Sequence, residues 1–191
     1  MRAYAPTHTP EHTPYPIPPL ESTPIDRTQR SPSFATPAGL TTPLLLKWML
    51  VWTHPISEEL WLLRALPRVW LQQGQEVKVR NAPTAYGGIT ISTSSSFGLQ
   101  QTIAVNLTLP TDWSAGARAQ PRWKPPPGGI RVRLRAPDSS ARMSAVTVGG
   151  RASRSFDADL ETVVISANDL KSADSLTALQ SIVVTFAKTR S

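Results

Sequence analysis

The sequence has no cysteine among its 191 residues. This absence excludes disulfide bonds, thiolate catalysis and zinc sites built on cysteine. Histidine is scarce as well, at His8, His12 and His54. A His-x3-His pair binds metal when both rings project from one helix, but Pro10 and Pro14 interrupt any helix around His8 and His12. We therefore expect no metal and no cofactor.

Long apolar segments are also missing. The first twenty residues contain no apolar core of the kind that a signal peptide needs. The most apolar run, LLLKWMLVW at 44–52, is too short to span a bilayer and contains Lys47. We expect no membrane span and interpret this run as buried structure. The sequence does not indicate a cellular compartment.

Acidic residues are few, 13 against 20 lysines and arginines, so the net charge is +7. Residues 118–154 hold nine of the basic residues and a single acid, Asp138. Such a field attracts polyanions, and it also keeps a protein soluble. The charge therefore leaves two interpretations open for this region.

Proline, by contrast, is abundant: ten of the 19 prolines precede residue 44, several of them in Thr-Pro pairs. Each proline removes an amide donor and disfavours helical backbone at the residue before it. We predict a disordered segment at 1–43. A partner-recruiting role, with PIPP at 16–19 docking on an aromatic groove, is an alternative to an uninvolved tail.

The body, 44–191, shows apolar residues at every second position in many short runs. Gly-, Pro- and Asp-rich turn signals separate these runs, for example PPPGG at 125–129. This pattern predicts a mainly β domain, an antiparallel β-sandwich. Helix is expected in only two places, a short turn within 56–71 that Ser57 caps and Pro67 ends, and a turn near 169–179.

The run IRVRLRAP at 130–137 alternates apolar residues with three arginines. Period two places Ile130, Val132 and Leu134 on the buried face, so the arginines share the opposite face. We expect that face, Arg131, Arg133 and Arg135, to be mostly solvated.

No catalytic constellation emerges from the residue types. Asp157, Asp159 and Glu161 form the closest group of carboxylates, and two acids can hydrolyse a glycosidic bond. Acids at this spacing between two strands more often solvate a turn, which is the interpretation that we adopt. The chain is therefore not expected to be an enzyme.

Six tryptophans are present. Trp48, Trp52, Trp61 and Trp70 lie among leucines, which favours a core or a large interface. Trp113 and Trp123 lie in an Ala/Gly/Pro-rich loop and are the better exposed candidates. We take the last two, together with the three arginines, as candidate ligand contacts: Trp113, Trp123, Arg131, Arg133 and Arg135.

The order of several phrases resembles a known domain. LWLLRALPRVWL is followed by NAPTAYGGITIS, PPGGIRVRLRAP, SAVTVGGRASRSFD and IVVTFA. Over about residues 48–187 this order is similar to the C-terminal β-sandwich that follows the (α/α)6 barrel of six-hairpin glycosidase-like proteins. Gly149-Gly150 replaces the usual Asn-Gly of one hairpin.

The resemblance implies a non-catalytic accessory module or fragment of a glycoside-hydrolase-like protein, structural or weakly carbohydrate-binding. Its implied partner is a catalytic barrel, in a domain or a subunit, and no catalytic residue carries over because the barrel holds the acids. The alternatives are a nucleic-acid-binding module that uses the Arg118–Arg154 region, and a proline-rich scaffold. No recognised nucleic-acid motif accompanies the charge, so nucleic acid is the less favoured partner.

Overall fold

A computed structural model describes residues 35–114 and 122–188. The disorder predicted for 1–34, and the position of Arg118, lie outside the described residues. The body forms one compact unit, Leu46–Ser191.

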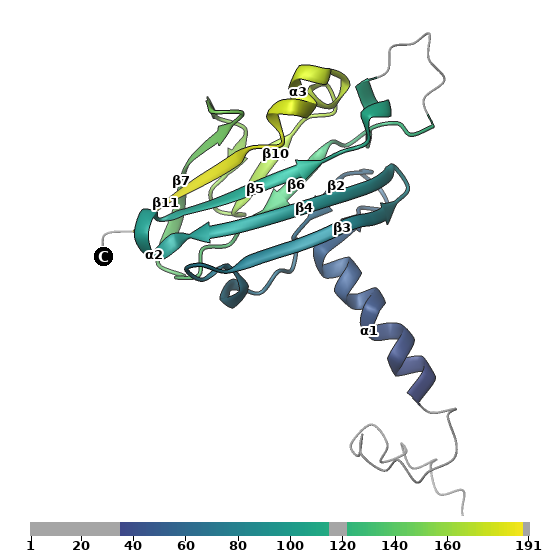
Figure 1. Cartoon of the computed structure of the whole chain (residues 1–191), viewed down its shortest axis with the longest axis horizontal. Helices are drawn as coiled ribbons and strands as arrows, with labels where there is room; N and C mark the ends of the chain where they lie inside the picture. Colours follow the sequence, from purple (N-terminus) through teal and green to yellow (C-terminus); the bar gives the residue numbers. More distant parts are fainter. Residues whose placement is uncertain (1–34, 115–121, 189–191) are drawn as a thin grey trace, which may run out of the picture. The chain divides into compact units, whose positions relative to one another are not determined.

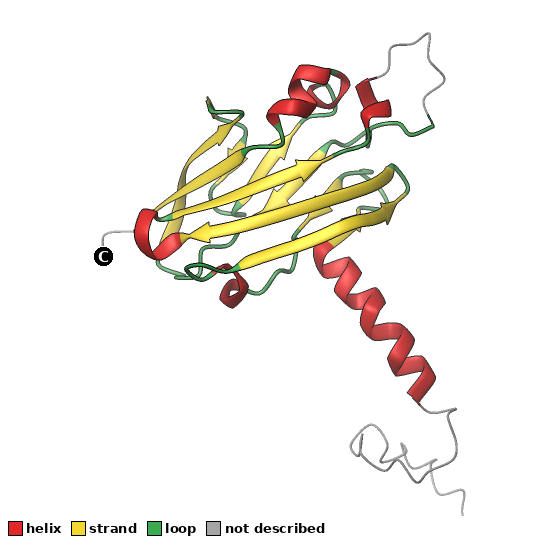
Figure 2. Ribbon diagram, in the orientation of Figure 1, coloured by secondary structure: helices red, strands yellow, loops and turns green. Residues whose placement is uncertain are grey.

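Strands dominate the described residues, as the alternation predicts (Figure 2). In chain order they are β1 (Val51–Thr53), β2 (Leu60–Leu62), β3 (Glu76–Thr84), β4 (Gly87–Ser96), β5 (Thr102–Thr108), β6 (Ile130–Arg133), β7 (Ala141–Val148), β8 (Arg151–Ser153), β9 (Phe156–Asp157), β10 (Thr162–Ile165) and β11 (Ile182–Lys188). The helices and 3-10 turns are α1 (Ala35–Leu50), η2 (Arg68–Leu71), α2 (Phe97–Gln100), η3 (Thr111–Ser114), η4 (Asp169–Lys171) and α3 (Ala173–Ala178).

The strands form two sheets, a β-sandwich (Figure 1). One sheet has the order β1-β2-β6-β10-β9 and the other β3-β4-β5-β11-β7-β8. The paired strands are antiparallel except for β2 and β6, which run parallel with Leu60 opposite Ile130. This parallel pair places the residues around β2 alongside the residues around β6. Most of the residues discussed below belong to these two stretches.

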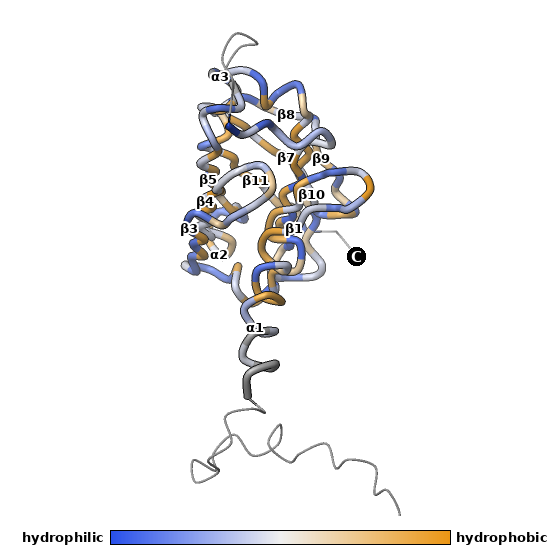
Figure 3. The backbone as a smooth tube through the Cα atoms, turned by 90° about the vertical axis from the view of Figure 1, so that its right-hand side faces the viewer, coloured by the Kyte–Doolittle hydropathy of each residue, from blue (hydrophilic) through white to orange (hydrophobic). Residues whose placement is uncertain are grey.

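The hydrophobic core is built from residues of both sheets, and hydrophobic positions occur along the strands of each sheet (Figure 3). The alternating apolar residues of the central strands are buried, which confirms the period-two prediction. Among them are Ile89, Ile91, Ile103, Val105, Leu107, Ile130, Val132, Val163, Ile165, Ile182 and Val184.

The helical turn predicted within 56–71 is wrong for most of its length. Residues Leu60–Leu62 form β2, and only Arg68–Leu71 form a 3-10 turn, preceded by Pro67. Leu60 and Leu62 are both fully buried, so this stretch buries every second residue, as a strand does. Pairing with β1 and β6 overrides the local helix propensity of the leucines. The turns predicted near 169–179 are confirmed as η4 and α3.

A second correction concerns α1, which takes in residues 35–43 of the segment predicted to lack regular structure. Pro37 lies in the first turn, where its missing N–H costs nothing, whereas Pro43 lies inside the helix, where it removes one intrahelical hydrogen bond. The helix also contradicts the interpretation of 44–52 as buried. Four of its large apolar side chains are exposed, Leu44, Leu45, Leu46 and Trp48. No helix in the described ranges is long and apolar enough to cross a bilayer.

Candidate ligand-binding cleft

The three arginines of β6 and the residues after it each bind the segment that follows β1. Arg131 Nε lies 2.7 Å from Glu59 Oε1, and Arg133 Nη1 donates to the Arg64 carbonyl at 3.4 Å. Arg135 donates to the Leu66 carbonyl. We call Arg131, Arg133 and Arg135 the arginine row. All three are half-buried, so the prediction of a solvated face is wrong.

The parallel pairing of β2 and β6 explains this arrangement. It brings residues 59–66 alongside residues 131–135, within reach of the long guanidinium side chains. Arg133 Nε and Arg135 Nε are buried without a hydrogen-bond partner among the described residues. Burial lowers the pKa of Arg135, the charges of Arg133 and Arg68 lower it further, and Glu161 opposes them. The arginine row is therefore part of the internal structure.

Arg68 of η2 binds residues that follow β6 and precede β10. Its guanidinium binds both carboxylate oxygens of Glu161 at 2.7 Å and donates to the Ala136 carbonyl. The Ala136 N–H donates to Glu161 Oε1 at 3.3 Å. Glu161 is buried, so the prediction that this acid solvates a turn is wrong.

The other two acids of that group do serve a turn. Asp157 Oδ1 accepts the backbone N–H groups of Asp159 and Leu160, both at 2.9 Å. Asp159 is exposed and pairs with Arg142 at 3.0 Å. The prediction that Asp157 and Asp159 belong to a turn is confirmed.

Trp113 and Trp123 were predicted to be exposed, and the structure corrects this. Trp113 is buried, 3% exposed, and its Nε1 donates to the Tyr86 carbonyl at 2.9 Å. Trp123 is half-buried and packs against the core. Gly87 permits that packing, because a Cβ there would lie 3.1 Å from Trp123 Cγ. Both indoles thus contribute to packing of the segment after β5 against the core.

Two other tryptophans lie side by side on the outer face of the five-stranded sheet. Trp52 of β1 is directly opposite Trp61 of β2, and Trp61 is opposite Arg131 of β6. The Arg64 guanidinium lies 4.0 Å from the Trp52 ring centroid, and that of Arg131 lies 5.5 Å from the Trp61 ring. Both indoles are half-buried, so the interpretation of Trp52 and Trp61 as core holds only in part.

Glu59 fixes the second of these tryptophans. Its Oε2 accepts the Trp61 Nε1–H at 3.2 Å while Oε1 binds Arg131. Burial acts to raise the pKa of Glu59, but the hydrogen bond and charge of Arg131, aided by Trp61 and Ser57, lower it on balance. Glu59 is thus held as a carboxylate between Trp61 and Arg131.

A cleft of about 550 Å³ opens beside Trp52. Its walls come from the end of α1, from β1 and from the turn between β3 and β4, and it is lined by Lys47, Trp48, Val51, Trp52, Thr53, Pro55, Pro83, Thr84 and Ala85. β1 and β3 are each the last strand of their sheet, so the cleft lies at an edge of the sandwich. Its volume falls in the range of about 300–1,000 Å³ typical of small-molecule sites.

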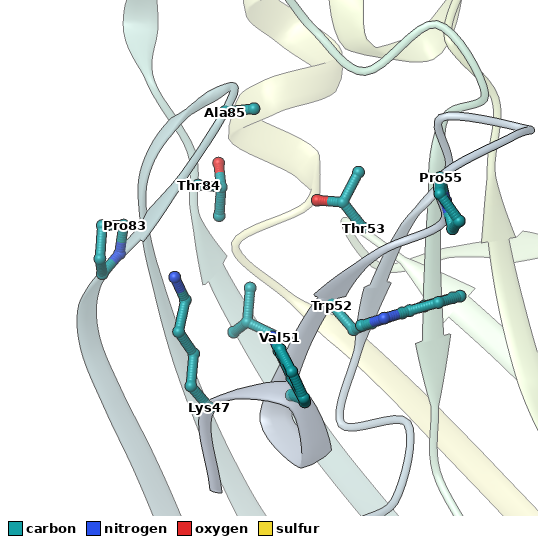
Figure 4. Close-up of a pocket in the computed structure, with 9 residues that line it drawn as sticks. Lys47, Val51, Trp52, Thr53, Pro55, Pro83, Thr84 and Ala85 are labelled. Atoms are coloured by element: carbon teal, nitrogen blue, oxygen red, sulfur yellow. The ribbon is translucent and has the colours of Figure 1, made fainter. Parts of the chain in front are cut away.

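Few polar groups line the cleft. Figure 4 shows the Lys47 ammonium directed toward Pro83 and Thr84, and the Thr53 hydroxyl directed toward Thr84. Thr84 Oγ1 is already engaged, because it donates to the Gly87 carbonyl and accepts the Tyr86 N–H. In the part of the chain that the structure describes, the Lys47 ammonium and the Thr53 hydroxyl have no protein hydrogen-bond partner. The cleft therefore offers one cation and one free hydroxyl between apolar and aromatic walls.

None of the described residues that line the cleft is acidic, and no three His, Asp or Glu residues gather as a metal site within 35–114 and 122–188. The sequence pointed to other residues because Lys47, Thr53 and Thr84 carry no motif. Only the fold brings together the end of α1, the edge strand β1 of one sheet and the end of the edge strand β3 of the other. Trp48 and Trp52 were noted in the sequence, but as part of a core or a large interface. Comparison with protein-family models, with curated proteins and with solved structures finds no match for this chain.

Proposed function

We propose that the body is a non-catalytic β-sandwich module that binds carbohydrate in the Trp52 cleft, as an accessory part of a glycoside-hydrolase-like protein. The observation that carries the proposal is the cleft itself, an edge site with two tryptophans, one free hydroxyl and one free ammonium. An indole ring is a flat apolar surface with a polar N–H, suited to the mixed apolar and polar surface of a sugar.

Binding is proposed rather than hydrolysis because of the residue types in the cleft. Glycoside hydrolysis requires two carboxylates that flank the scissile bond. The described lining residues supply none, and the buried Glu161 is occupied by Arg68. We expect no activity on a panel of aryl glycosides, and turnover that is lost in Asp157→Asn and Asp159→Asn would contradict this.

The proposed partner is a catalytic (α/α)6 barrel, in the same chain or in a second one. The exposed apolar side chains of α1 support this, because contiguous apolar surface on a protein commonly marks an interface. Leu46 and Trp48 are 43% and 48% exposed, which is high for side chains of this size.

The test compares the half-buried indole of Trp52 with the exposed indole of Trp70. Trp52→Ala removes a wall of the cleft, whereas Trp70→Ala removes a 39% exposed indole of η2 that does not line it. We expect Trp52→Ala to weaken oligosaccharide binding at least about tenfold, which corresponds to about 1.4 kcal/mol. Trp70→Ala should bind like the unmodified chain. Isothermal titration calorimetry of the full chain against a panel of neutral and acidic oligosaccharides measures both.

Two results would overturn the proposal. One is the absence of binding to every oligosaccharide of the panel at millimolar concentration. The other is equal affinity of the Trp52→Ala and Trp70→Ala variants for the sugar that binds. Circular dichroism of each variant confirms that the fold is intact before the affinities are compared.

A further inference from the structure

The arginines beside β6 all have an oxygen partner, a carboxylate or a backbone carbonyl, but two basic side chains near Trp52 have none among the described residues. Arg131 pairs with Glu59 and Arg68 with Glu161. Lys47 and Arg64 have no carboxylate within 4.0 Å among the described residues. Both are exposed, and both lie at Trp52, Lys47 in the cleft and Arg64 on the indole ring.

His54 adds a third donor at the same indole. Its ring meets the Trp52 ring edge-on, with centroids 5.2 Å apart and planes at 80°. Nδ1 accepts the backbone N–H groups of Ile56 at 3.2 Å and Ser57 at 3.1 Å. An imidazole nitrogen that accepts carries no proton, so the proton lies on Nε2. Nε2 has no partner among the described residues and can donate to a ligand.

Nearby carboxylates do not cancel these donors. Glu59 is held by Arg131 and Trp61, as described above. Glu58 lies on the same turn, where its carbonyl accepts the Tyr86 hydroxyl at 3.3 Å. Burial raises the pKa of Tyr86 and the Glu58 charge raises it further, so the Glu58 carboxylate is near the Tyr86 hydroxyl. Within the described ranges, no carboxylate therefore pairs with the Lys47 ammonium or the Arg64 guanidinium.

We infer that the ligand of the Trp52 cleft is an acidic glycan, a chain of sugars that bear carboxylates. This inference rests on the proposed carbohydrate-binding function. One carboxylate binds Lys47 within the cleft while a sugar ring packs against the indole walls. A carboxylate of a following sugar binds Arg64 and His54 beside Trp52. Two separate cations at one indole suit a polymer with repeated charge better than a single acidic sugar.

Guanidinium and ammonium groups contribute differently at these two positions. Arg64 presents a planar fork that matches a carboxylate with two parallel hydrogen bonds, and its contact with the Trp52 ring holds the guanidinium beside the indole. Lys47 is a flexible point charge at the entrance of the cleft. We therefore expect Arg64 to contribute more to selectivity and Lys47 more to attraction at low salt.

The experiment uses two probes that differ only in charge, a uronic-acid hexasaccharide and the same hexasaccharide with its carboxyl groups reduced to alcohols. The full chain, Lys47→Gln, Arg64→Gln and the double variant are titrated with each probe by calorimetry. Control variants are Lys171→Gln and Arg142→Gln, which remove exposed cations from η4 and β7. We expect the unmodified chain to prefer the acidic probe by about tenfold to a hundredfold.

The expected result is that each cleft variant loses roughly tenfold in affinity for the acidic probe and little for the reduced one. Both control variants should bind like the unmodified chain. Equal affinity for the two probes, with loss in Trp52→Ala, would overturn the acidic-glycan inference while the proposed function stands. No affinity for either probe or for any neutral sugar would overturn both the acidic-glycan inference and the proposed function. A single-stranded RNA oligomer that competes at equal or lower concentration would also overturn the inference, in favour of nucleic acid.

Discussion

The arginine row and the cations at Trp52 share a positive charge, but they differ in what they contact. Arg131, Arg133 and Arg135 bind a glutamate and two backbone carbonyls of the segment beside them. The Lys47 ammonium and the Arg64 guanidinium bind no protein oxygen among the described residues. The difference teaches that a row of alternating arginines is not by itself a binding surface. A neighbouring segment of the same chain can supply a hydrogen-bond acceptor to every arginine of the row.

The largest expected effect comes from the ion pair between the half-buried Arg68 and the buried Glu161. Glu161→Gln leaves the Arg68 guanidinium without its carboxylate and should lower the free energy of unfolding by about 3 kcal/mol. Asp159→Asn is the matched control, since that pair is exposed and should contribute under about 0.5 kcal/mol. Guanidinium-chloride unfolding followed by fluorescence measures both. Equal effects of the two substitutions would show that Arg68 and Glu161 do not act as a buried pair.

The second prediction separates the arginine row from free arginines. Arg131→Gln, Arg133→Gln and Arg135→Gln together should cost about 2 kcal/mol, because charge-assisted hydrogen bonds are lost while mutual repulsion is relieved. The triple substitution Arg64→Gln, Arg142→Gln and Arg151→Gln, all at exposed positions, should stay within about 0.5 kcal/mol. If both triple variants unfold at the same denaturant concentration, the arginine row is a solvated face after all.

A smaller effect should appear at low pH. The pKa of Glu59 lies below its ordinary value of 4.5 in the folded chain, so its contribution to stability is present above that value. The contribution is lost as the pH falls through the lowered pKa. Arg131→Gln removes the main lowering cause, so its stability should decline less between pH 5 and pH 3 than that of the unmodified chain. Parallel declines in urea unfolding at the two pH values would contradict this origin.

The strands could be predicted from the sequence because a strand of a sandwich buries every second side chain. Ile103, Val105 and Leu107 show that period directly, and all three are buried. β2 escaped prediction because LWLLRAL reads equally well as a helix, and only β1 and β6 decide between the two. The start of α1 escaped because Pro37 and Pro43 were taken to forbid helix, although a first-turn proline is compatible with it.

The site was harder to predict, for a different reason. Arg131 is correctly placed on the outer face by period two, but its partner Glu59 lies 72 residues away and is brought near only by the parallel pair. Trp113 was taken for an exposed side chain because its loop is rich in small residues, yet its Nε1–H is satisfied by a carbonyl of the β3–β4 turn. Lys47 and Thr84 carry no motif, and only the fold brings the end of α1 close to the end of the edge strand β3.

The central claim is that the cations at Trp52 are free for a ligand while the arginine row is not. Amide chemical-shift mapping tests it most directly, with the isotope-labelled full chain titrated with the uronic-acid hexasaccharide. We predict shifts confined to residues 47–55 and 83–86, together with the Trp52 indole N–H and Arg64. Shifts centred on residues 131–135, or no shifts at millimolar hexasaccharide, would contradict the claim.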